Sequence, residues 1–154
     1  MYQRILVPTD GSQVAAVAAQ AAIALAKAFG SEIVALSVVQ PEPVVPLAEG
    51  TGVIAGRGPD ALMEEARKQV EQVARAATEA GVKCTSLTCY GDSPADEIVD
   101  AAKRTGCDLI YIASHGRRGL SRLIAGSVTQ RVLAYAPVPV MVYRPQATAG
   151  GPAA

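Results

Sequence analysis

The chain has 154 residues, enough for one domain with a substantial hydrophobic core. Fourteen basic residues balance fourteen acidic ones, so the net charge gives no argument for binding nucleic acid or a membrane surface. Half of the residues are hydrophobic, mostly small and aliphatic, with one Phe and no Trp. Such side chains suit helices packed closely on a sheet.

The cysteines and the N-terminus indicate the redox environment and the cellular location of the protein. Cys84, Cys89 and Cys107 form no CxxC pair, and the one histidine, His115, cannot complete a zinc site with them. We expect buried thiols in a reducing compartment, with a redox or metal-binding protein as a distant alternative. The N-terminus has no long apolar segment of a secretory signal, and the apolar stretch 14–29 is interrupted by polar residues. The expected location is therefore the cytoplasm, without a membrane span.

The first half of the chain alternates strand and helix patterns. Residues 4–8 are apolar and end in the turn TDGS, which predicts a buried strand. Helical spacing of apolar residues predicts a helix over 12–29 that ends at Gly30, and residues 32–39 predict a second strand. Residues 40–59 are rich in Pro and Gly and too long for a bare connection. They predict a lid or a short helix rather than a linker between domains.

The second half continues the alternation. A helix is predicted over 60–80 and an alternating strand over 82–90. Ser93 as N-cap and Pro94 at the first helical position predict a helix that ends at Gly106, and residues 108–113 predict the fourth strand.

The last elements are one helix and one strand. Inward apolar positions predict a helix up to Ala136, at Leu120, Leu123, Ile124, Val128 and Val132. Residues 138–143 predict the fifth strand, placed at a sheet edge because Pro139 lacks an amide hydrogen. We expect one domain over 1–144 and a disordered tail over 145–154.

Five predicted strands alternate with four predicted helices, which predicts an α/β fold: a parallel sheet with helices on both faces, in three layers. In such sheets, ligands bind beyond the carboxyl ends of the strands, where the strand order reverses. The loops 8–12 and 114–119 lie on this rim. They face each other if the first and fourth strands are neighbours.

The segment IASHGRRGLSRLIAGSV, residues 112–128, runs from a strand through a glycine-punctuated loop into a helix. Gly116 and Gly126 are separated by nine residues, and Ser127 follows. Glycines leave room for a bound group, and amides at a helix start favour an anion, which predicts a phosphate cradle. An ordinary loop with turn glycines remains open as the alternative. No GxxxxGK[ST] pattern is present, so P-loop hydrolysis is not supported.

Three segments, ILVPTDGS, GDSPADEIVDAA and SHGRRGLSRLIAGSV, occur in an order and spacing that resemble the universal stress protein family over residues 2–144. The resemblance implies a Rossmann-like or adenine nucleotide α-hydrolase-like fold with strand order 3-2-1-4-5. It also implies a homodimer formed through the last strands, which matches an edge strand at Val138–Tyr143. One branch of the family binds ATP through G-x2-G-x9-G-[ST], and the other branch binds no nucleotide.

The motif fits this chain except at its first glycine, which is Ala113 here. An alanine that ends a strand is expected to be tolerated at some loss of affinity, since negative φ is its default. By the same resemblance, Asp10 binds the ribose hydroxyls beside Pro8 and Thr9, and the Val38 backbone contacts adenine. The phosphates, with Mg²⁺ shared between them and water, are held by Gly116, Gly126, Ser127 and the Val128 amide. Loop neighbours that complete the candidate nucleotide-binding set are His115, Arg117 and Gly119.

Each candidate also has a structural interpretation. Asp10 is a common helix cap, although Ser12 is also available for that role. His115 has no nucleophile and acid placed to form a triad, so a loop histidine held by the backbone is favoured. The three loop arginines Arg117, Arg118 and Arg122 are favoured as solvated side chains rather than phosphate ligands. Thr129 and Gln130 are predicted to lie on the helix surface.

The sequence therefore favours an ATP-binding regulatory protein of the stress response that acts as a dimer. The second hypothesis is a dimeric interaction protein of the same fold without nucleotide, motivated by Ala113. The third is a slow ATPase, which rests on fold analogy alone because no general base is evident near the phosphates.

Overall fold

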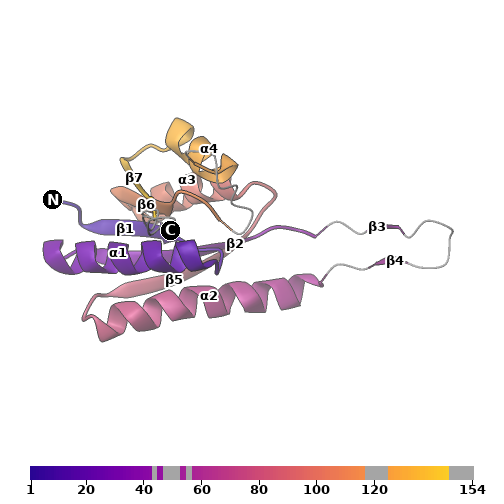
Figure 1. Ribbon diagram of the computed structural model, residues 1–154, viewed down its shortest axis with the longest axis horizontal. Coiled ribbons are helices and arrows are strands. Elements are labelled where there is room, and N and C mark those ends of the chain that lie inside the picture. The colour runs from indigo at the N-terminus through magenta and orange to yellow at the C-terminus, as the bar shows by residue number, and fades with distance from the viewer. Residues whose placement is uncertain (43–44, 47–52, 55–56, 117–124, 146–154) are drawn as a thin grey trace, which may run out of the picture.

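A five-stranded parallel sheet forms the centre of the molecule (Figure 1). The computed structural model describes all residues except 43–44, 47–52, 55–56, 117–124 and 146–154. The strands lie in the order β5-β2-β1-β6-β7. Their bounds are Cys84–Tyr90, Glu32–Val39, Arg4–Pro8, Leu109–Ala113 and Val140–Tyr143 in that order. Counted along the chain, these five strands have the order 3-2-1-4-5, as the resemblance implied.

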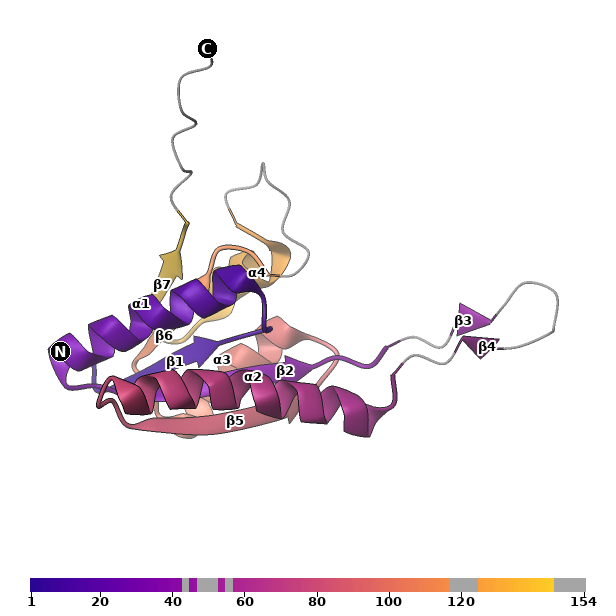
Figure 2. The ribbon, with the colours of Figure 1, turned by 60° about the horizontal axis from the view of Figure 1, so that its bottom comes forward.

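Helices cover both faces of the sheet and complete three layers (Figure 2). On one face, α1 (Gln13–Phe29) and α2 (Pro59–Glu79) pack over one apolar cluster. On the other face, α3 (Pro94–Thr105) and α4 (Ser127–Tyr135) pack over a second cluster. The central strand β1 supplies both clusters, because Ile5 and Val7 face α1 and α2 while Leu6 faces α3 and α4. None of the helices among the described residues has the length and apolarity that a bilayer span requires.

The ends of α1 and α3 follow local capping rules. The Ser12 side chain accepts a hydrogen bond from the amide of Ala15, and the Ser93 side chain does the same for Asp96. The two helices end at Gly30 and Gly106, which have φ of 68° and 65°. Only glycine adopts this left-handed conformation without strain, so both predicted helix ends are confirmed.

The described residues of the segment 40–59 contain no helix before Pro59, where α2 begins, so the predicted short helix is wrong there. It contains β3 (Val45–Pro46) and β4 (Val53–Ile54), which pair antiparallel with each other. Both strands extend away from the body of the molecule (Figures 1 and 2). Half of the residues on which the prediction of a lid falls lie outside the described part, and the lid stays a prediction.

The last helix begins later than predicted. Gly126 has extended backbone angles, with φ of −70° and ψ of 164°, and α4 starts at Ser127. A continuous helix that carries Leu120, Leu123 and Ile124 into α4 is therefore wrong at Gly126, and those three residues lie outside the described part. At the C-terminus, Pro139 precedes β7, which is an edge of the sheet as predicted. The predicted tail falls almost entirely on residues 146–154, outside the described part.

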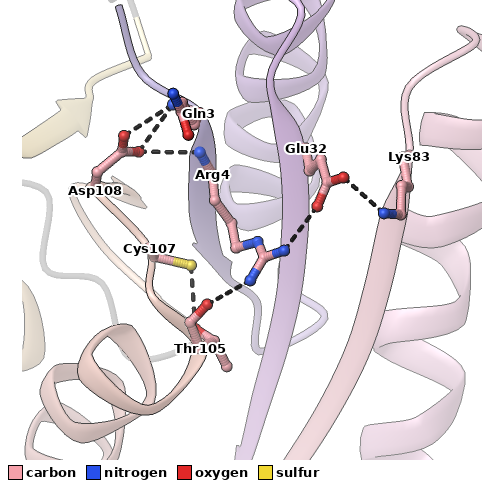
Figure 3. A network of polar contacts seen from close by, with 7 residues as sticks. All are labelled: Gln3, Arg4, Glu32, Lys83, Thr105, Cys107 and Asp108. Atoms are coloured by element: carbon pink, nitrogen blue, oxygen red, sulfur yellow. Dashed lines mark hydrogen bonds and ion pairs between the residues drawn. The ribbon is translucent and has the colours of Figure 1, made fainter.

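A polar network lies at the amino ends of the strands (Figure 3). The Asp108 carboxylate accepts hydrogen bonds from the backbone amides of Gln3 and Arg4, at 2.9 to 3.1 Å. The Arg4 guanidinium contacts Glu32 at 3.0 Å, and Lys83 contacts the same carboxylate at 2.6 Å. This network ties β1, β2 and the starts of β5 and β6 together at the sheet edge opposite the predicted ligand rim.

Candidate functional site

The carboxyl ends of β1 and β6 lie side by side at the centre of the sheet. β1 pairs with β2 on one side and with β6 on the other. The chain leaves β1 for α1 on one face of the sheet and leaves β6 for α4 on the opposite face. A crevice outside the strand ends is expected where the chain diverges in this way. We call this edge the carboxyl rim: residues 8–12, 37–39, 113–116 and 126–129.

Asp10 lies in the turn between β1 and α1. Its Oδ1 accepts a hydrogen bond from the Ser12 amide at 2.9 Å, and Ser12 itself caps the helix. The cap and the candidate ligand are therefore different residues, so the alternative that Asp10 caps α1 is wrong. The next residue, Gly11, has φ of 75°, which lets the chain turn sharply after Asp10.

Gly116 lies directly against Asp10. A Cβ built on Gly116 would overlap Oδ2 of the Asp10 carboxylate. Gly116 is not among the glycines with positive φ, so close approach rather than backbone conformation requires a glycine here. The predicted meeting of the two loops is confirmed by this contact and by the pairing of β1 with β6.

The start of α4 presents backbone amides to the carboxyl rim. The Gly126 amide donates to the Ser114 carbonyl at 2.7 Å, which brings the helix start back to the end of β6. No side chain caps α4 among the described residues, and its first turn contains no acidic residue. In contrast, serines cap α1 and α3. The exposed Ser127 and the half-buried Val128 occupy this first turn, where the helix dipole favours negative charge.

Ala113, the last residue of β6, is paired with Tyr143 of β7. Its side chain is 6% exposed and belongs to the apolar cluster beneath α1 and α2. The Ala113 carbonyl accepts a hydrogen bond from Oγ1 of Thr129 at 2.8 Å. Thr129 is 3% exposed, so the prediction of a surface position is wrong. The sequence signal for burial of Thr129 is its position three residues before Val132, which places both side chains on the same face of the helix. Gln130 is exposed as predicted.

His115 lies in the loop after β6, between Ser114 and Gly116. Its Nδ1 is 3.1 Å from Oγ of Ser114, which is fully buried. The predicted backbone contact is therefore replaced by a side-chain hydroxyl. Its Nε2 is buried and has no hydrogen-bond partner among the described residues. A buried polar atom of this kind costs free energy unless a partner reaches it.

The ends of β1 and β2 complete the rim. Pro8 is the last residue of β1, and the amide of the buried Thr9 donates to the Leu36 carbonyl at 2.8 Å. Backbone groups two residues apart on a strand point to the same side, so those of Val38 point toward β1. Since β1 ends level with Leu36, the Val38 backbone faces the rim. Arg117 and Gly119, also predicted site residues, lie outside the described part.

One protein-family model matches nearly the whole length of the chain. The model of the universal stress protein family matches residues 1–144. The chain belongs to the universal stress protein family. Universal stress protein MJ0531 of Methanocaldococcus jannaschii is 39% identical over 94% of this chain and 83% of that protein. Universal stress protein YxiE of Bacillus subtilis is 34% identical over 94% of this chain and its own full length.

Solved structures of universal stress proteins share the fold. The structure of MJ0577 from M. jannaschii has a TM-score of 0.74 and 26% identity, and covers 96% of this chain and 99% of its own. A universal stress protein in complex with cAMP has a TM-score of 0.68 at 22% identity, over 93% and 97% of the two chains. A universal stress protein from Arabidopsis thaliana with AMP bound has a TM-score of 0.65 at 20% identity, and covers 91% of this chain and 90% of its own.

Proposed function

We propose that this universal stress protein binds an adenine nucleotide, ATP, at the carboxyl rim and acts as a regulatory homodimer in the stress response. The observation that carries the proposal is the contact of Gly116 with the Asp10 carboxylate beside the uncapped start of α4. A carboxylate suited to ribose hydroxyls and backbone amides suited to phosphates thus lie on one rim. The complexes of distant family members with cAMP and AMP point to the same ligand class.

The adenosine end of the ligand is assigned to β1 and β2. Asp10 would accept hydrogen bonds from the ribose hydroxyls, with Pro8 and Thr9 beside it. The Val38 amide and carbonyl, which face the rim, would pair with the polar edge of adenine. A backbone donor and acceptor on one residue suit a ring that presents both kinds of group along one edge.

The phosphate end is assigned to the start of α4. The amides of Ser127 and Val128 and the space left by Gly116 and Gly126 would hold phosphate oxygens. The buried Nε2 of His115 offers a further polar atom on the same rim. The described residues contain no cluster of three His, Cys, Asp or Glu side chains, so the proposed Mg²⁺ is carried by phosphate oxygens and water.

Ala113 does not oppose this assignment. The first glycine of the family motif is replaced here, but the Ala113 methyl packs in the core beneath α1 and α2. A methyl that points into the core is not in the way of a ligand beyond the strand ends. The replacement is thus compatible with nucleotide binding, and the alternative of a dimeric protein without nucleotide becomes the negative outcome of the binding experiment.

The test is calorimetric titration of ATP with Mg²⁺ into wild type and two alanine variants. A Cβ at Gly126 would lie 3.6 Å from the Ser114 carbonyl, an ordinary contact, so Gly126→Ala is expected to fold. Gly58→Ala is the matched control, since Gly58 is also an extended N-cap with open space around it. We expect binding to wild type and Gly58→Ala and at least about tenfold weaker binding to Gly126→Ala. The absence of heat and of a thermal shift in wild type contradicts the proposal.

The proposed dimer pairs β7 with its copy in a second chain. β7 is an edge strand, so one row of its backbone groups has no strand partner within the described sheet. Exposed apolar side chains lie on and near it: Leu133, Tyr135 and Met141. Light scattering at micromolar concentration should give twice the mass of one chain, and Met141→Asp should shift the distribution to monomer. A monomeric wild type contradicts this part of the proposal.

A further inference from the structure

Gln69 of α2 reaches under the carboxyl rim from the helical layer. It lies in a groove between α1 and α2, lined also by Thr9, Gly11 and Gln72. Its Oε1 accepts a hydrogen bond from Oγ of Ser37 at 2.7 Å, and Ser37 is only 2% exposed. Its Nε2 donates to Glu65 at 3.3 Å. A Cβ on Gly11 would lie 2.9 Å from the Gln69 Nε2, so the side-chain amide lies against the Gly11 backbone.

These contacts reach both halves of the proposed adenosine site. Ser37 immediately precedes Val38, whose backbone is assigned to adenine. Gly11 immediately follows Asp10, which is assigned to the ribose. One side chain from a third element, α2, therefore contacts the end of β2 and the turn after β1 at the same time.

The orientation of the Gln69 amide is determined by its neighbours. A carboxylate only accepts hydrogen bonds, so the Glu65 contact requires the NH₂ group on that side. The amide oxygen then faces the Ser37 hydroxyl, which must donate to it. A buried hydroxyl needs a hydrogen-bond partner, and Gln69 supplies it from a side chain that also packs on Gly11. The side chain is thus held at three points.

We propose that Gln69 is a positioning residue of the nucleotide site, which sets the place of the Asp10 carboxylate and so its reach to the ribose hydroxyls. The inference rests on the proposed function. The Asp10 carboxylate accepts from the Ser12 amide, so residues 10–12 form one turn that moves as a unit. Gln69 supports this turn from the side of α2, while Gly116 limits it from the side of β6. Without the amide contacts, the turn loses the support that Gln69 gives it from the side of α2.

The test compares ATP with dATP in three variants, using calorimetry for dissociation constants and thermal denaturation for stability. Gln69→Met keeps the length of the side chain and removes both hydrogen bonds. Ser37→Ala removes the hydroxyl donor and leaves the contact with Gly11. Gln72→Met is the matched control, because Gln72 lines the same groove and forms no side-chain hydrogen bond with any described residue.

We expect Gln69→Met to weaken ATP binding about tenfold, the loss of one hydrogen bond to a charged group, while dATP binding changes little. The ratio of the two dissociation constants then falls toward one. Ser37→Ala should change the ratio in the same direction, and Gln72→Met should leave it at the wild-type value. A purely structural role would instead weaken both nucleotides equally. A lower melting temperature of Gln69→Met is expected in either case, because the buried Ser37 hydroxyl loses its acceptor.

Two results overturn the inference and are distinguishable. If wild type binds both nucleotides and Gln69→Met and Ser37→Ala keep the wild-type ratio, or weaken both nucleotides equally, the positioning role is wrong and the proposed function stands. If wild type binds neither nucleotide, the proposed function fails and this inference fails with it.

Discussion

The two edges of the central sheet use polar groups in opposite ways. At the amino edge, the Asp108 carboxylate is satisfied by backbone amides, and Glu32 is paired with Arg4 and Lys83. At the carboxyl rim, the start of α4 has no side-chain cap among the described residues, and Nε2 of His115 is buried without a described partner. Within the described part of the chain, the polar groups of the amino edge satisfy one another, whereas the rim contains polar groups without such a partner.

The comparison separates stability from binding. Polar groups that satisfy one another contribute to the free energy of unfolding and offer little to a ligand. Groups left without partners lower the free energy of unfolding. A ligand that binds them in the folded state raises it again. We therefore expect substitutions at the amino edge to change stability alone, and substitutions of the rim groups assigned to the ligand to change nucleotide affinity.

The largest expected effect is at the rim. Gly116→Ala places a methyl group where the Asp10 carboxylate lies and would displace this carboxylate from its proposed position against the ribose. We expect at least about a hundredfold loss of ATP affinity, since hydrogen bonds to a charged group are lost. Calorimetry measures it, with Gly58→Ala as the control in open space. An unchanged dissociation constant would show that Asp10 does not contact the nucleotide. The proposed difference in binding between the two edges would then lose its main support.

The next effect belongs to the amino edge. Burial alone would raise the pKa of Asp108, but hydrogen bonds from the Gln3 and Arg4 amides outweigh it and lower the pKa below its usual value. Asp108→Asn weakens these charge-assisted bonds and should cost about 2 kcal/mol of unfolding free energy at pH 7, with ATP affinity unchanged. Urea denaturation measures the first quantity and calorimetry the second.

The pH dependence of this variant has a defined sign. Because the folded-state pKa of Asp108 is lowered, its stabilisation is complete above about pH 5 and disappears as the pH falls through that lowered pKa. The stability gap between wild type and Asp108→Asn should therefore narrow below about pH 4. A gap that stays constant into acid would show that the carboxylate charge is not the stabilising feature.

A smaller effect is expected at Thr129, which links the rim to the core. Thr129→Val keeps the shape and removes the hydrogen bond to the Ala113 carbonyl. Leaving this carbonyl without its partner should cost about 1 to 2 kcal/mol. Thr129→Ser keeps the hydroxyl and is the control in the same denaturation experiment. Equal stability of the Ser and Val variants would mean that packing, not the hydrogen bond, fixes the position.

The smallest effect is expected at Glu32. The hydrogen bond from Lys83, followed by that from Arg4, lowers the pKa of this half-buried carboxylate, whose two partners are exposed. Exposed ion pairs are screened by salt and contribute little to stability. Glu32→Gln should leave the denaturation midpoint at 0.15 M salt unchanged within error. A clear loss would show that the network in Figure 3 acts as one unit rather than as separate pairs.

Features determined by neighbours in sequence were predictable. The strand Arg4–Pro8 is apolar on both faces because it is central, and the glycines and serines at the ends of α1 and α3 act within a few residues. The start of α4 was not predictable in this way, because apolar periodicity continues through Gly126 although the backbone there is extended. The strands β3 and β4 pair only two residues each, which leaves almost no alternating pattern to detect.

The site was predictable only where motifs mark it. Asp10, Gly116 and Gly126 stand out as turn and loop residues, and their meeting depends on the pairing of β1 with β6, which strand order implies. Thr129 and Gln69 belong to no such motif. Both are polar residues on amphipathic helices, and their inward contacts arise from how α4 and α2 pack on the sheet.

The hydrogen bond between the Gly126 amide and the Ser114 carbonyl has a consequence for the free energy of binding. It joins the two ends of the segment between β6 and α4, and the scaffold holds both ends in place. The end of β6 and the first amides of α4 are therefore held next to each other by the described residues alone. A phosphate site built on them would be preorganised, so that binding would spend little free energy on ordering it.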